Sequence, residues 1–434
     1  MPSILHVSHN RDVSGATELI PTEIASLARR GLKADWTVAP VGVDARAATY
    51  ALRRALCGAE DAHVDVAAAR KAIGSYVAGN APHIEEAGAS FDVIVLHAAL
   101  AVTLAPRLRS TGALVVWRCH TGHDVMNTAL RTAQSLLKPY VAAVDHMVFP
   151  SLASSWPDAD GSRSTVIPPG LDIRSWKNRD LDPTVSARWW AGLSQGGEAA
   201  VSLDEGHSGE VGTVRFDDRG TGFLASERSP FLACVSRWDP LKGQLGLVHG
   251  FAKLAEHWPE LELVLVGPLV DPGRRVPDTA AEYWRRLHSA WLGLPPDVRR
   301  RAHLWQIVPS RKEAEDLAIN LVQRRARVIL QNSHREAYGL TVSEAMWKGT
   351  VVVASEVGGI PERLRHDHNG LLTKDITGGA EWAATVDRAL RDVDGRARWS
   401  AAARQTIEGE YLLEETVTRQ LDLFARQAIR SGER

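Results

Sequence analysis

Short, β-branched apolar runs alternate with amphipathic segments along almost the whole chain, and this alternation restricts the fold more than any other feature. Each run is nearly continuous in apolar residues, which is typical of strands buried on both faces of a parallel sheet. The segments between them, such as residues 18–32, have helical periodicity. The runs form two groups, residues 4–8, 34–40, 92–97, 113–120, 146–151 and 164–170, and residues 231–237, 261–267, 302–307, 326–333 and 350–359. We predict an α/β fold with two doubly wound, Rossmann-like domains.

A stretch of different composition lies between the two groups. Residues 192–222 contain eight glycines among scattered acidic residues, which predicts a mobile insertion or linker. Ligands of such open sheets bind beyond the carboxyl ends of the strands, so we expect the two domains to face each other across a cleft. The predicted divisions are a domain at 1–172, a linker at 173–228, a second domain at 229–410 and a final helix at 411–434.

Composition excludes several classes of function. Lysine and arginine total 51 and aspartate and glutamate total 52, so the net charge of -1 argues against broad binding of nucleic acid. Three scattered cysteines do not make a disulfide framework or a zinc cage. The start of the chain lacks the features of a secretory signal, and no apolar run reaches the ~20 residues that span a bilayer. We expect a cytoplasmic protein without an integral membrane segment, and the sequence leaves a homodimer open.

The segment REAYGLTVSEAMWKG, residues 335–349, places two glutamates in an apolar context after a predicted strand. Thr341 and Glu344 fit a capping box, which gives Glu344 a purely structural interpretation. Alternatively, the helix start would bind a phosphate, and Gly339 would let it approach the backbone. Carboxylates accept hydrogen bonds from hydroxyl groups, so Glu336 would hold a sugar and Glu344 a ribose. This interpretation predicts a nucleotide-sugar site.

The segment VSRWDPLKGQ, residues 235–244, places two cations after the first strand of the second domain. Arg237 and Lys242 are five residues apart across a turn. Such a pair can neutralise a diphosphate leaving group without a metal ion. We therefore expect no metal and no other cofactor.

The segment VVWRCHTGHD, residues 115–124, gathers Arg118, His120, His123 and Asp124 after a strand of the first domain. The two histidines could ligate zinc, but no further ligand set accompanies them. A histidine that makes a structural hydrogen bond at the strand end is a second interpretation. We favour contact with the transferred sugar. In SHNRDVSGATE, residues 8–18, Gly15 would form a tight turn without the GxGxxG spacing of dinucleotide sites.

Several of these segments carry a family resemblance. The Glu-x7-Glu segment, the Arg-x4-Lys pair and EVGGIPE, residues 356–362, resemble the retaining glycosyltransferases of the GT-B fold in the glycogen-synthase-like clan. WRCH, VSRWDPLKG and REAYGLTVSEAMWKG resemble trehalose glycosyltransferring synthases and trehalose phosphorylases. The resemblance implies an acceptor-side first domain, a nucleotide-sugar-binding second domain and a final helix that crosses back to the first.

The resemblance also implies residue roles. Arg237 and Lys242 would grip the diphosphate, and Glu344 would hold the ribose. Glu336 would contact the donor sugar, and His120 would face that sugar from the first domain. The remaining donor contacts would come from Gly15, Gly339, Leu340 and Thr341. His120, Arg237, Lys242 and Glu336 are the implied catalytic residues, whereas Arg118, His123 and Asp124 are the acceptor-side candidates.

These observations predict a metal-independent retaining transferase that moves a hexosyl unit, glucose by resemblance, from a nucleoside-diphosphate sugar to a small hydroxyl acceptor. Glucose as acceptor would give trehalose. VSGATE and HTGHD depart from the trehalose synthase pattern, so the acceptor stays open, and it could be a specialised metabolite. The sequence also leaves open a phosphorylase that uses inorganic phosphate, a nucleotide-sugar epimerase, and a nucleotide-sugar-binding protein without catalysis.

Overall fold

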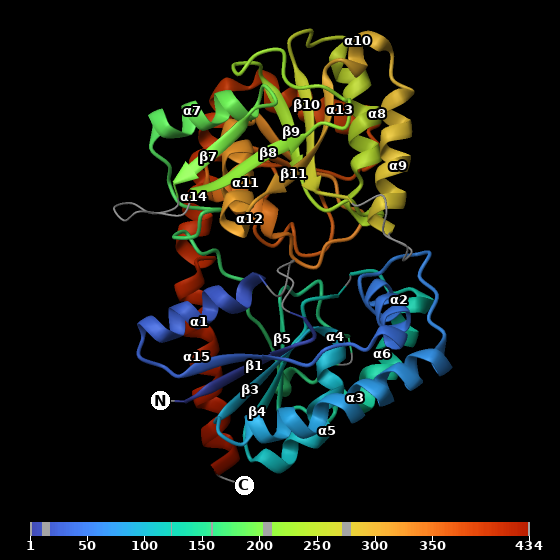
Figure 1. The fold of residues 1–434 in the computed structure, drawn as a ribbon, viewed down its shortest axis with the longest axis vertical. Helices are drawn as coiled ribbons and strands as arrows, with labels where there is room; N and C mark the ends of the chain where they lie inside the picture. Colours follow the sequence, from blue (N-terminus) through green and yellow to red (C-terminus); the bar gives the residue numbers. More distant parts are fainter. Residues whose placement is uncertain are drawn as a thin grey trace. The chain divides into compact units, whose positions relative to one another are not determined.

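The computed structural model describes residues 2–10, 18–122, 124–157, 159–202, 211–270 and 279–432. The chain divides into two compact units (Figure 1). The N-terminal unit comprises residues 1–170, 335–338 and 411–434, and the C-terminal unit comprises residues 171–334 and 339–410. Each unit has its own sheet and its own helices.

The sheet of the N-terminal unit is entirely parallel, in the order β2-β1-β3-β4-β5-β6. Its strands are β1 Ile4–Ser8, β2 Ala34–Val38, β3 Val93–His97, β4 Leu114–Arg118, β5 His146–Phe149 and β6 Ser164–Val166. The helices are α1 Leu19–Arg29, α2 Arg46–Leu56, α3 Val66–Gly88, α4 Ala98–Ala101, α5 Ala105–Leu108, α6 Thr128–Val141 and α15 Leu413–Gly432.

Alternation along these strands builds two cores, one on each face of the sheet. Leu5 and Val7 of β1 point to the core that also contains side chains of α2, α3 and α6. Ile4 and the alternate residues of β3 and β4 point to the other face, where Leu27 of α1 and Val417 of α15 pack. Successive side chains of a strand point to opposite faces, so even-numbered residues of β1 belong to the α1 and α15 face.

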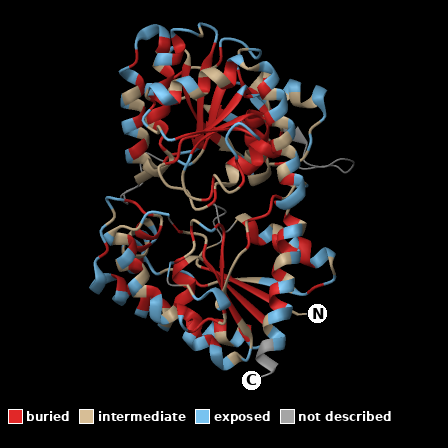
Figure 2. Cartoon of the chain, turned by 180° about the vertical axis from the view of Figure 1, so that it is seen from behind, coloured by how far each residue is buried: buried red, intermediate tan, exposed pale blue. Residues whose placement is uncertain are grey.

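The C-terminal unit has an eight-stranded sheet in the order β14-β13-β12-β9-β10-β11-β8-β7. Its parallel strands are β9 Phe231–Val235, β10 Glu262–Pro268, β11 Ala302–Pro309, β12 Val328–Gln331, β13 Val352–Ser355 and β14 Leu371–Thr373, and the antiparallel edge consists of β7 Glu198–Ser202 and β8 Val211–Asp217. The helices are α7 Pro183–Leu193, α8 Gln244–Ala255, α9 Thr279–Leu292, α10 Pro296–Arg299, α11 Lys312–Arg325, α12 Leu340–Trp347, α13 Ala380–Arg391 and α14 Val393–Glu410. The central strands are buried in both sheets (Figure 2).

The predicted fold class, two doubly wound Rossmann-like domains, is confirmed, and every predicted strand is present. The predicted linker is wrong. The described residues of 173–228 belong to the C-terminal unit, where they form α7 and two strands. Strand β8 pairs with β11 from Val214 to Asp217, and β7 pairs with β8. The two strands therefore widen the sheet at this edge. Glycine-rich composition concealed this hairpin because strands are usually poor in glycine.

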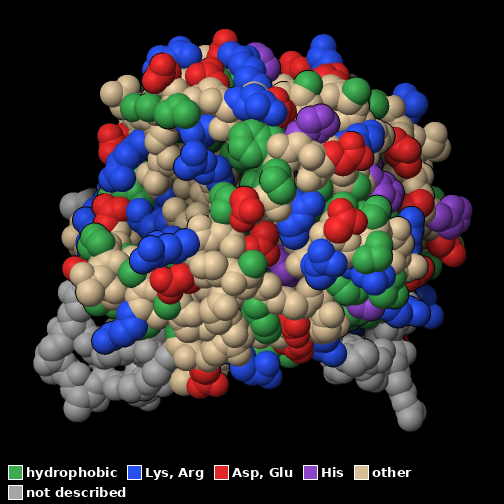
Figure 3. Space-filling view, turned by 90° about the horizontal axis from the view of Figure 1, so that it is seen from above, with side chains coloured by type: hydrophobic (Ala, Val, Ile, Leu, Met, Phe, Trp, Pro, Cys, Tyr) green, Lys and Arg blue, Asp and Glu red, His purple; other side chains and the backbone are tan. Residues whose placement is uncertain are grey.

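The described helices include none that is long and apolar enough to cross a membrane. Figure 3 shows one face of the molecule, on which basic and acidic side chains are intermixed rather than gathered by sign. This distribution matches the balanced charge of the sequence.

Candidate functional site

The strand order of the C-terminal unit identifies where a ligand would bind. From β9 the chain adds β10 and β11 on one side, and then it crosses to place β12 on the other side of β9. Beyond the carboxyl ends of β9 and β12, the connections diverge, and such switch points are where open α/β sheets bind ligands. The Arg237–Lys242 motif follows β9, and the loop to Gly339 follows β12. Both predicted phosphate-binding motifs therefore begin at this switch point.

The loop after β9 is a tight turn that starts a helix. Asp239 accepts a hydrogen bond from the Leu241 amide over 3.0 Å, and Gly243 has a φ of 65° directly before α8. Arg237 is exposed, and its guanidinium lies 3.6 Å from the Asp239 carboxylate. Lys242 is half-buried at the end of the turn. The positive φ at 243 requires glycine, which places Lys242 at the start of α8.

Asn332 joins this turn to the loop after β12. Its amide nitrogen donates to the carbonyl oxygens of Gly243, over 2.8 Å, and of Ile376, over 2.7 Å. The backbone amide of His334 donates to the Leu241 carbonyl over 2.8 Å. A Cβ atom at position 243 would lie 2.1 Å from the Asn332 carbonyl oxygen, so only glycine fits the approach. The two loops are thereby held in one fixed arrangement at the switch point.

Helix α12 begins at a glycine and not at the predicted capping box. Gly339 is the N-cap residue, with a φ of 88°, and no side chain caps the helix. The guanidinium of Arg363, which is buried, donates to the carbonyl oxygens of Gly339 and Gly359. The structural interpretation of Glu344 as a capping residue is therefore wrong, because Gly339 is the N-cap residue and the Glu344 carboxylate contacts Lys177 and Gln323 instead. Leu340 and Thr341 lie in the first turn of α12, and their predicted contact with a phosphate stays a prediction.

Glu344 lies in a buried cluster of charged and polar groups, which we call the Glu344 cluster: Glu344, Lys177, Lys348 and Gln323. One carboxylate oxygen of Glu344 lies 3.2 Å from the Lys177 ammonium, and the other accepts a hydrogen bond from Gln323 over 3.0 Å. Burial raises the pKa of Glu344, but the charges of Lys177 and Lys348 and the hydrogen bonds from Gln323 and Lys177 together lower it, so the net shift is downward. Burial lowers the pKa of Lys348 to about 7, although Glu344 opposes that change. An ionised Glu344 keeps lone pairs for hydroxyl groups beyond its two protein partners.

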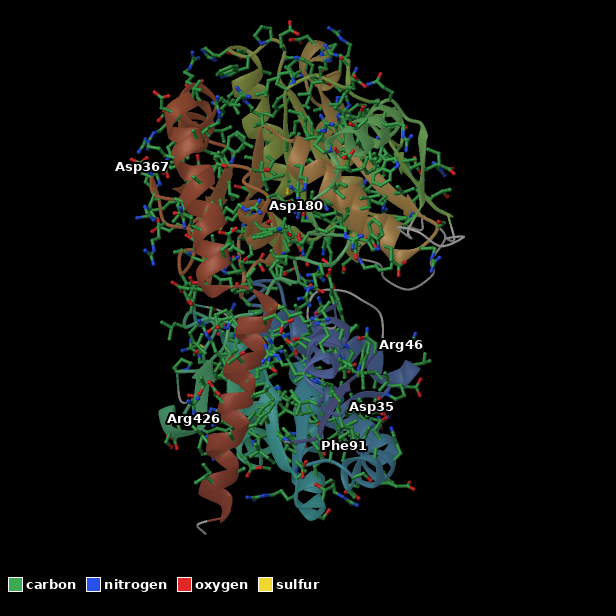
Figure 4. All side chains as sticks on the ribbon, turned by 90° about the vertical axis from the view of Figure 1, so that its left-hand side faces the viewer. Asp35, Arg46, Phe91, Asp180, Asp367 and Arg426 are labelled. Carbon is green, nitrogen blue, oxygen red and sulfur yellow. The ribbon has the colours of Figure 1, made fainter. Side chains whose placement is uncertain are left out.

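The loop that carries Lys177 is anchored on α11. Asn320 donates to the carbonyl oxygens of Trp176 and Arg179, each over 2.9 Å. Arg324 forms an ion pair of 2.9 Å with Asp180, which is labelled in Figure 4. Lys177 was not predicted from the sequence because its stretch was assigned to a linker. The segment RSWKNRD, rich in basic and aromatic residues directly after a strand and its turn, was the signal that could have identified it.

Glu336 belongs to residues 335–338, which group with the N-terminal unit. There the Ser151 hydroxyl donates to the Ala337 carbonyl over 2.7 Å, and Arg335 forms an ion pair of 3.0 Å with Glu60. Glu336 itself is half-buried. Its predicted contact with a donor sugar stays a prediction.

The site residues predicted in the N-terminal unit differ in how far they are buried. His120 is half-buried after β4, and its Nε2 lies 2.9 Å from Nδ1 of His97. Arg118 was expected to face an acceptor, but it is 3% exposed and its guanidinium pairs with the buried carboxylate of Glu23. This burial argues against the acceptor-side role. Asp124 is exposed. Gly15 and His123 lie outside the described residues.

The described part of the chain holds no group of three or more His, Cys, Asp or Glu side chains arranged to bind a metal ion. The three cysteines are free thiols, and burial raises the pKa of Cys119 to about 12.

Comparison with known proteins shows which proteins this chain resembles. Residues 222–406 match the family of group 1 glycosyl transferases, and residues 6–154 match the N-terminal domain of trehalose synthase. An enzyme called UDP-forming α,α-trehalose-phosphate synthase, from Burkholderia xenovorans, has a TM-score of 0.70 at 15% identity, covering 99% of this chain and 100% of that one. The Anabaena protein HepE, solved in complex with UDP-glucose, has a TM-score of 0.65 at 17% identity, covering 98% and 100%. Residues 222–406 therefore match the group 1 glycosyl transferases, and the chain has the GT-B fold.

Within this class, the chain is trehalose synthase-like. The trehalose synthase of Rubrobacter xylanophilus is 27% identical over 429 residues, which are 98% of this chain and 90% of that relative. The predicted resemblance is thereby confirmed.

Proposed function

We propose that this protein is a retaining hexosyltransferase that moves glucose from a nucleoside-diphosphate sugar to an acceptor hydroxyl, with glucose as the first acceptor to test. One observation carries the proposal. The turn with Lys242 and the loop before α12 are clasped by Asn332 at a single switch point. Two cationic side chains and two helix starts then converge where a diphosphate would bind.

The reaction breaks the bond between the anomeric carbon and the diphosphate oxygen and forms a bond from that carbon to the acceptor oxygen. Negative charge grows on the departing diphosphate, and Arg237, Lys242 and the first turn of α12 would stabilise it. Preorganised donors of this kind are the largest single contribution in many enzymes. The site needs no metal ion in this proposal because the protein supplies the positive charge.

Glu344 would accept hydrogen bonds from ribose hydroxyls with its remaining lone pairs, and Lys177 would hold it ionised. Glu336 would contact the transferred sugar. Glu336 is not proposed as a nucleophile of the glycosidase type, since that mechanism needs a second carboxylic acid about 5–5.5 Å away across the sugar. Glu344, in its cluster with Lys177, does not serve as such an acid.

The decisive experiment is a mass-spectrometric screen of the purified chain with ADP-, UDP- and GDP-glucose, each with glucose as acceptor and with EDTA present. We expect a disaccharide from at least one donor, and we expect Glu336→Gln to abolish it. Product formation that stops with EDTA would contradict metal independence.

Three further reactions distinguish the competing functions. Inorganic phosphate with trehalose tests a phosphorylase, and donor alone tests an epimerase. A screen of varied hydroxyl acceptors tests a specialised metabolite. Binding of a nucleotide sugar without turnover in any of these reactions would overturn the transferase proposal.

A further inference from the structure

Three histidines form a continuous row in the N-terminal unit, which we call the histidine row: His6, His97 and His120. Nδ1 of His6 lies 2.9 Å from Nε2 of His97, and Nδ1 of His97 lies 2.9 Å from Nε2 of His120. The ring centroids are 5.1 and 5.2 Å apart. Every contact joins the Nδ1 of one ring to the Nε2 of the next, so the row has a direction.

The register of the sheet produces this row. His6 of β1 pairs with Val95 of β3, and His97, two residues further, pairs with Arg118 of β4. His120 follows Arg118 by two residues. Each step of two residues keeps the side chain on the same face of the sheet. The row therefore climbs diagonally from the middle of β1 to the carboxyl edge, across the β1–β3 switch point of this sheet.

The two ends of the row have different surroundings. His6 and His97 are buried, and Nε2 of His6 has no hydrogen-bond partner among the residues that the structure describes. The Glu23–Arg118 ion pair belongs to the same buried layer. His120 is half-buried, and its Nδ1 is the ring nitrogen that the row does not use. Among the three rings of the row, His120 is therefore the most exposed.

Hydrogen-bond chemistry couples the three tautomers. A neutral imidazole has one donor nitrogen and one acceptor nitrogen. Burial lowers the pKa of all three rings, which favours the neutral forms. Two arrangements then satisfy both contacts: all three protons on Nδ1, or all three on Nε2. The second would leave a buried N–H at His6 without an acceptor, whereas the first leaves only a lone pair there. Buried donors without partners are rare, so the first arrangement is favoured.

We propose that His6 and His97 are positioning residues that hold His120 as the Nδ1–H tautomer, so that His120 presents a hydrogen-bond donor to a sugar hydroxyl oxygen. The nature of the ligand rests on the proposed function, but the tautomer does not. In this arrangement His120 cannot act as a base, because its Nε2 already accepts from His97.

The test is long-range ¹H–¹⁵N correlation NMR of the full chain labelled with ¹⁵N-histidine at neutral pH. The three rings are assigned from the signals lost in His6→Gln, His97→Gln and His120→Gln. We expect protonated Nδ1 and unprotonated Nε2 in all three rings of the unsubstituted protein. An Nε2–H signal for His120 in that protein would overturn the proposal, and this result needs no substituted chain to be active.

A pair of substitutions at the far end of the row tests the coupling. His6→Phe removes the donor to His97 and should release His120 into a mixture of tautomers. His6→Gln retains an N–H donor and should keep the Nδ1–H form. We expect kcat/KM to fall about ten-fold in His6→Phe, the effect of one hydrogen bond, and to recover to within about three-fold in His6→Gln. An unchanged His120 tautomer in a folded His6→Phe protein would overturn the coupling.

His146→Gln is the matched control, since His146 is another buried histidine of this sheet, bonded to Thr165 over 2.8 Å and outside the row. It should leave both the His120 tautomer and kcat/KM unchanged. If the unsubstituted protein transfers sugar from no donor, the proposed function fails, while the spectra still decide the tautomer. Transfer by a protein with the wrong tautomer overturns this inference alone.

Discussion

The two units bury polar groups in opposite ways. The histidine row of the N-terminal unit consists of rings whose low pKa keeps them neutral, joined by hydrogen bonds. The Glu344 cluster of the C-terminal unit consists of a carboxylate with a lowered pKa and two lysines beside it. Both adjoin the carboxyl end of a parallel sheet. The comparison teaches that burial alone does not decide the protonation of a site. The neutral row suits donation of a hydrogen bond to a hydroxyl oxygen, and the ionised carboxylate of the charged cluster suits acceptance of hydrogen bonds from hydroxyl groups.

The largest expected effect is on the charged side of this comparison. Glu344→Ala would leave Lys177 and Lys348 without their carboxylate in a buried setting, so we expect a loss of about 3–5 kcal/mol in the free energy of unfolding. Urea denaturation at pH 7 measures it. Glu344 opposes the lowering of the Lys348 pKa, so its removal should lower that pKa further and leave Lys348 neutral at pH 7. The loss should therefore come mainly from the unpaired Lys177 charge and should change little between pH 7 and pH 9.

Glu344→Gln is the control, since it keeps the shape and the capacity to accept from Gln323 and removes only the charge. It should be less destabilising than Glu344→Ala. A loss below about 1 kcal/mol in Glu344→Ala would mean that the cluster is effectively solvated, and the contrast between the units would disappear.

The next effect is catalytic. Lys242→Ala should reduce turnover by about two to three orders of magnitude, because removing one preorganised charge costs about 3–4 kcal/mol in the transition state. Initial rates with the donor identified in the screen measure it. Lys71→Ala, at an exposed position of α3, is the control and should be unaffected. A Lys242→Ala enzyme with normal turnover would remove the diphosphate role from the turn after β9.

The neutral side of the comparison predicts sensitivity to acid. Burial lowers the pKa of His6 from 6.5 to about 4, a shift that Glu23 opposes and Arg118 reinforces. Below pH 6.5 the unfolded chain binds a proton at His6, whereas the native chain does not bind this proton until about pH 4. The free energy of unfolding therefore falls as the pH is lowered from 6.5 to about 4. The contribution of His6 to that loss is about 3 kcal/mol.

His6→Gln should remove this part of the pH dependence. Free energies of unfolding for both proteins at about pH 7, 6, 5 and 4.5 test it, with the difference between the two curves isolating His6 from the remaining titratable groups. Parallel curves would show that His6 binds its proton equally in the native and the unfolded chain, which would contradict the lowered pKa of His6.

The parallel strands were predictable from the sequence because continuous apolar runs leave few other structures open to them. The strands β7 and β8 were not predictable in this way. Strand β8 pairs antiparallel with β11, roughly 90 residues away, and β7 pairs with β8, so neither pairing depends on local apolar composition. Apolar periodicity shows which residues of a strand are buried, but it does not show which polar side chains contact each other. His6 was therefore passed over as one residue of an apolar run, although it begins the histidine row.

Site residues followed the same division. Short-range spacing placed Lys242, Gly339 and Glu344 correctly at a loop and a helix start, and their roles in binding stay predictions. Lys177 and the partners of His120 were missed because they meet their targets through sheet register and through a loop anchored on α11. Arg118 was misjudged for the same reason: spacing placed it at a strand end, but only α1 supplies the Glu23 that buries it.

The smallest expected effect concerns Asn332, which joins the turn after β9 to the loop after β12. Asn332→Asp replaces an amide that donates to the Gly243 and Ile376 carbonyls with a carboxylate oxygen facing them. Because two hydrogen bonds are lost, we expect the activation free energy of the reaction with the donor to rise by about 2 kcal/mol. This change lowers kcat/KM roughly thirty-fold.

Asn80→Asp is the matched control. Asn80, on α3 of the N-terminal unit, is also buried, and it donates to the Pro40 and Tyr76 carbonyls over 3.1 and 2.8 Å. The two substitutions should cost similar free energies of unfolding, but only Asn332→Asp should weaken nucleoside-diphosphate binding in calorimetric titration. Equal affinities in the two proteins would mean that Asn332 stabilises the fold without arranging the phosphate site, because the same chemical change would then act only through folding.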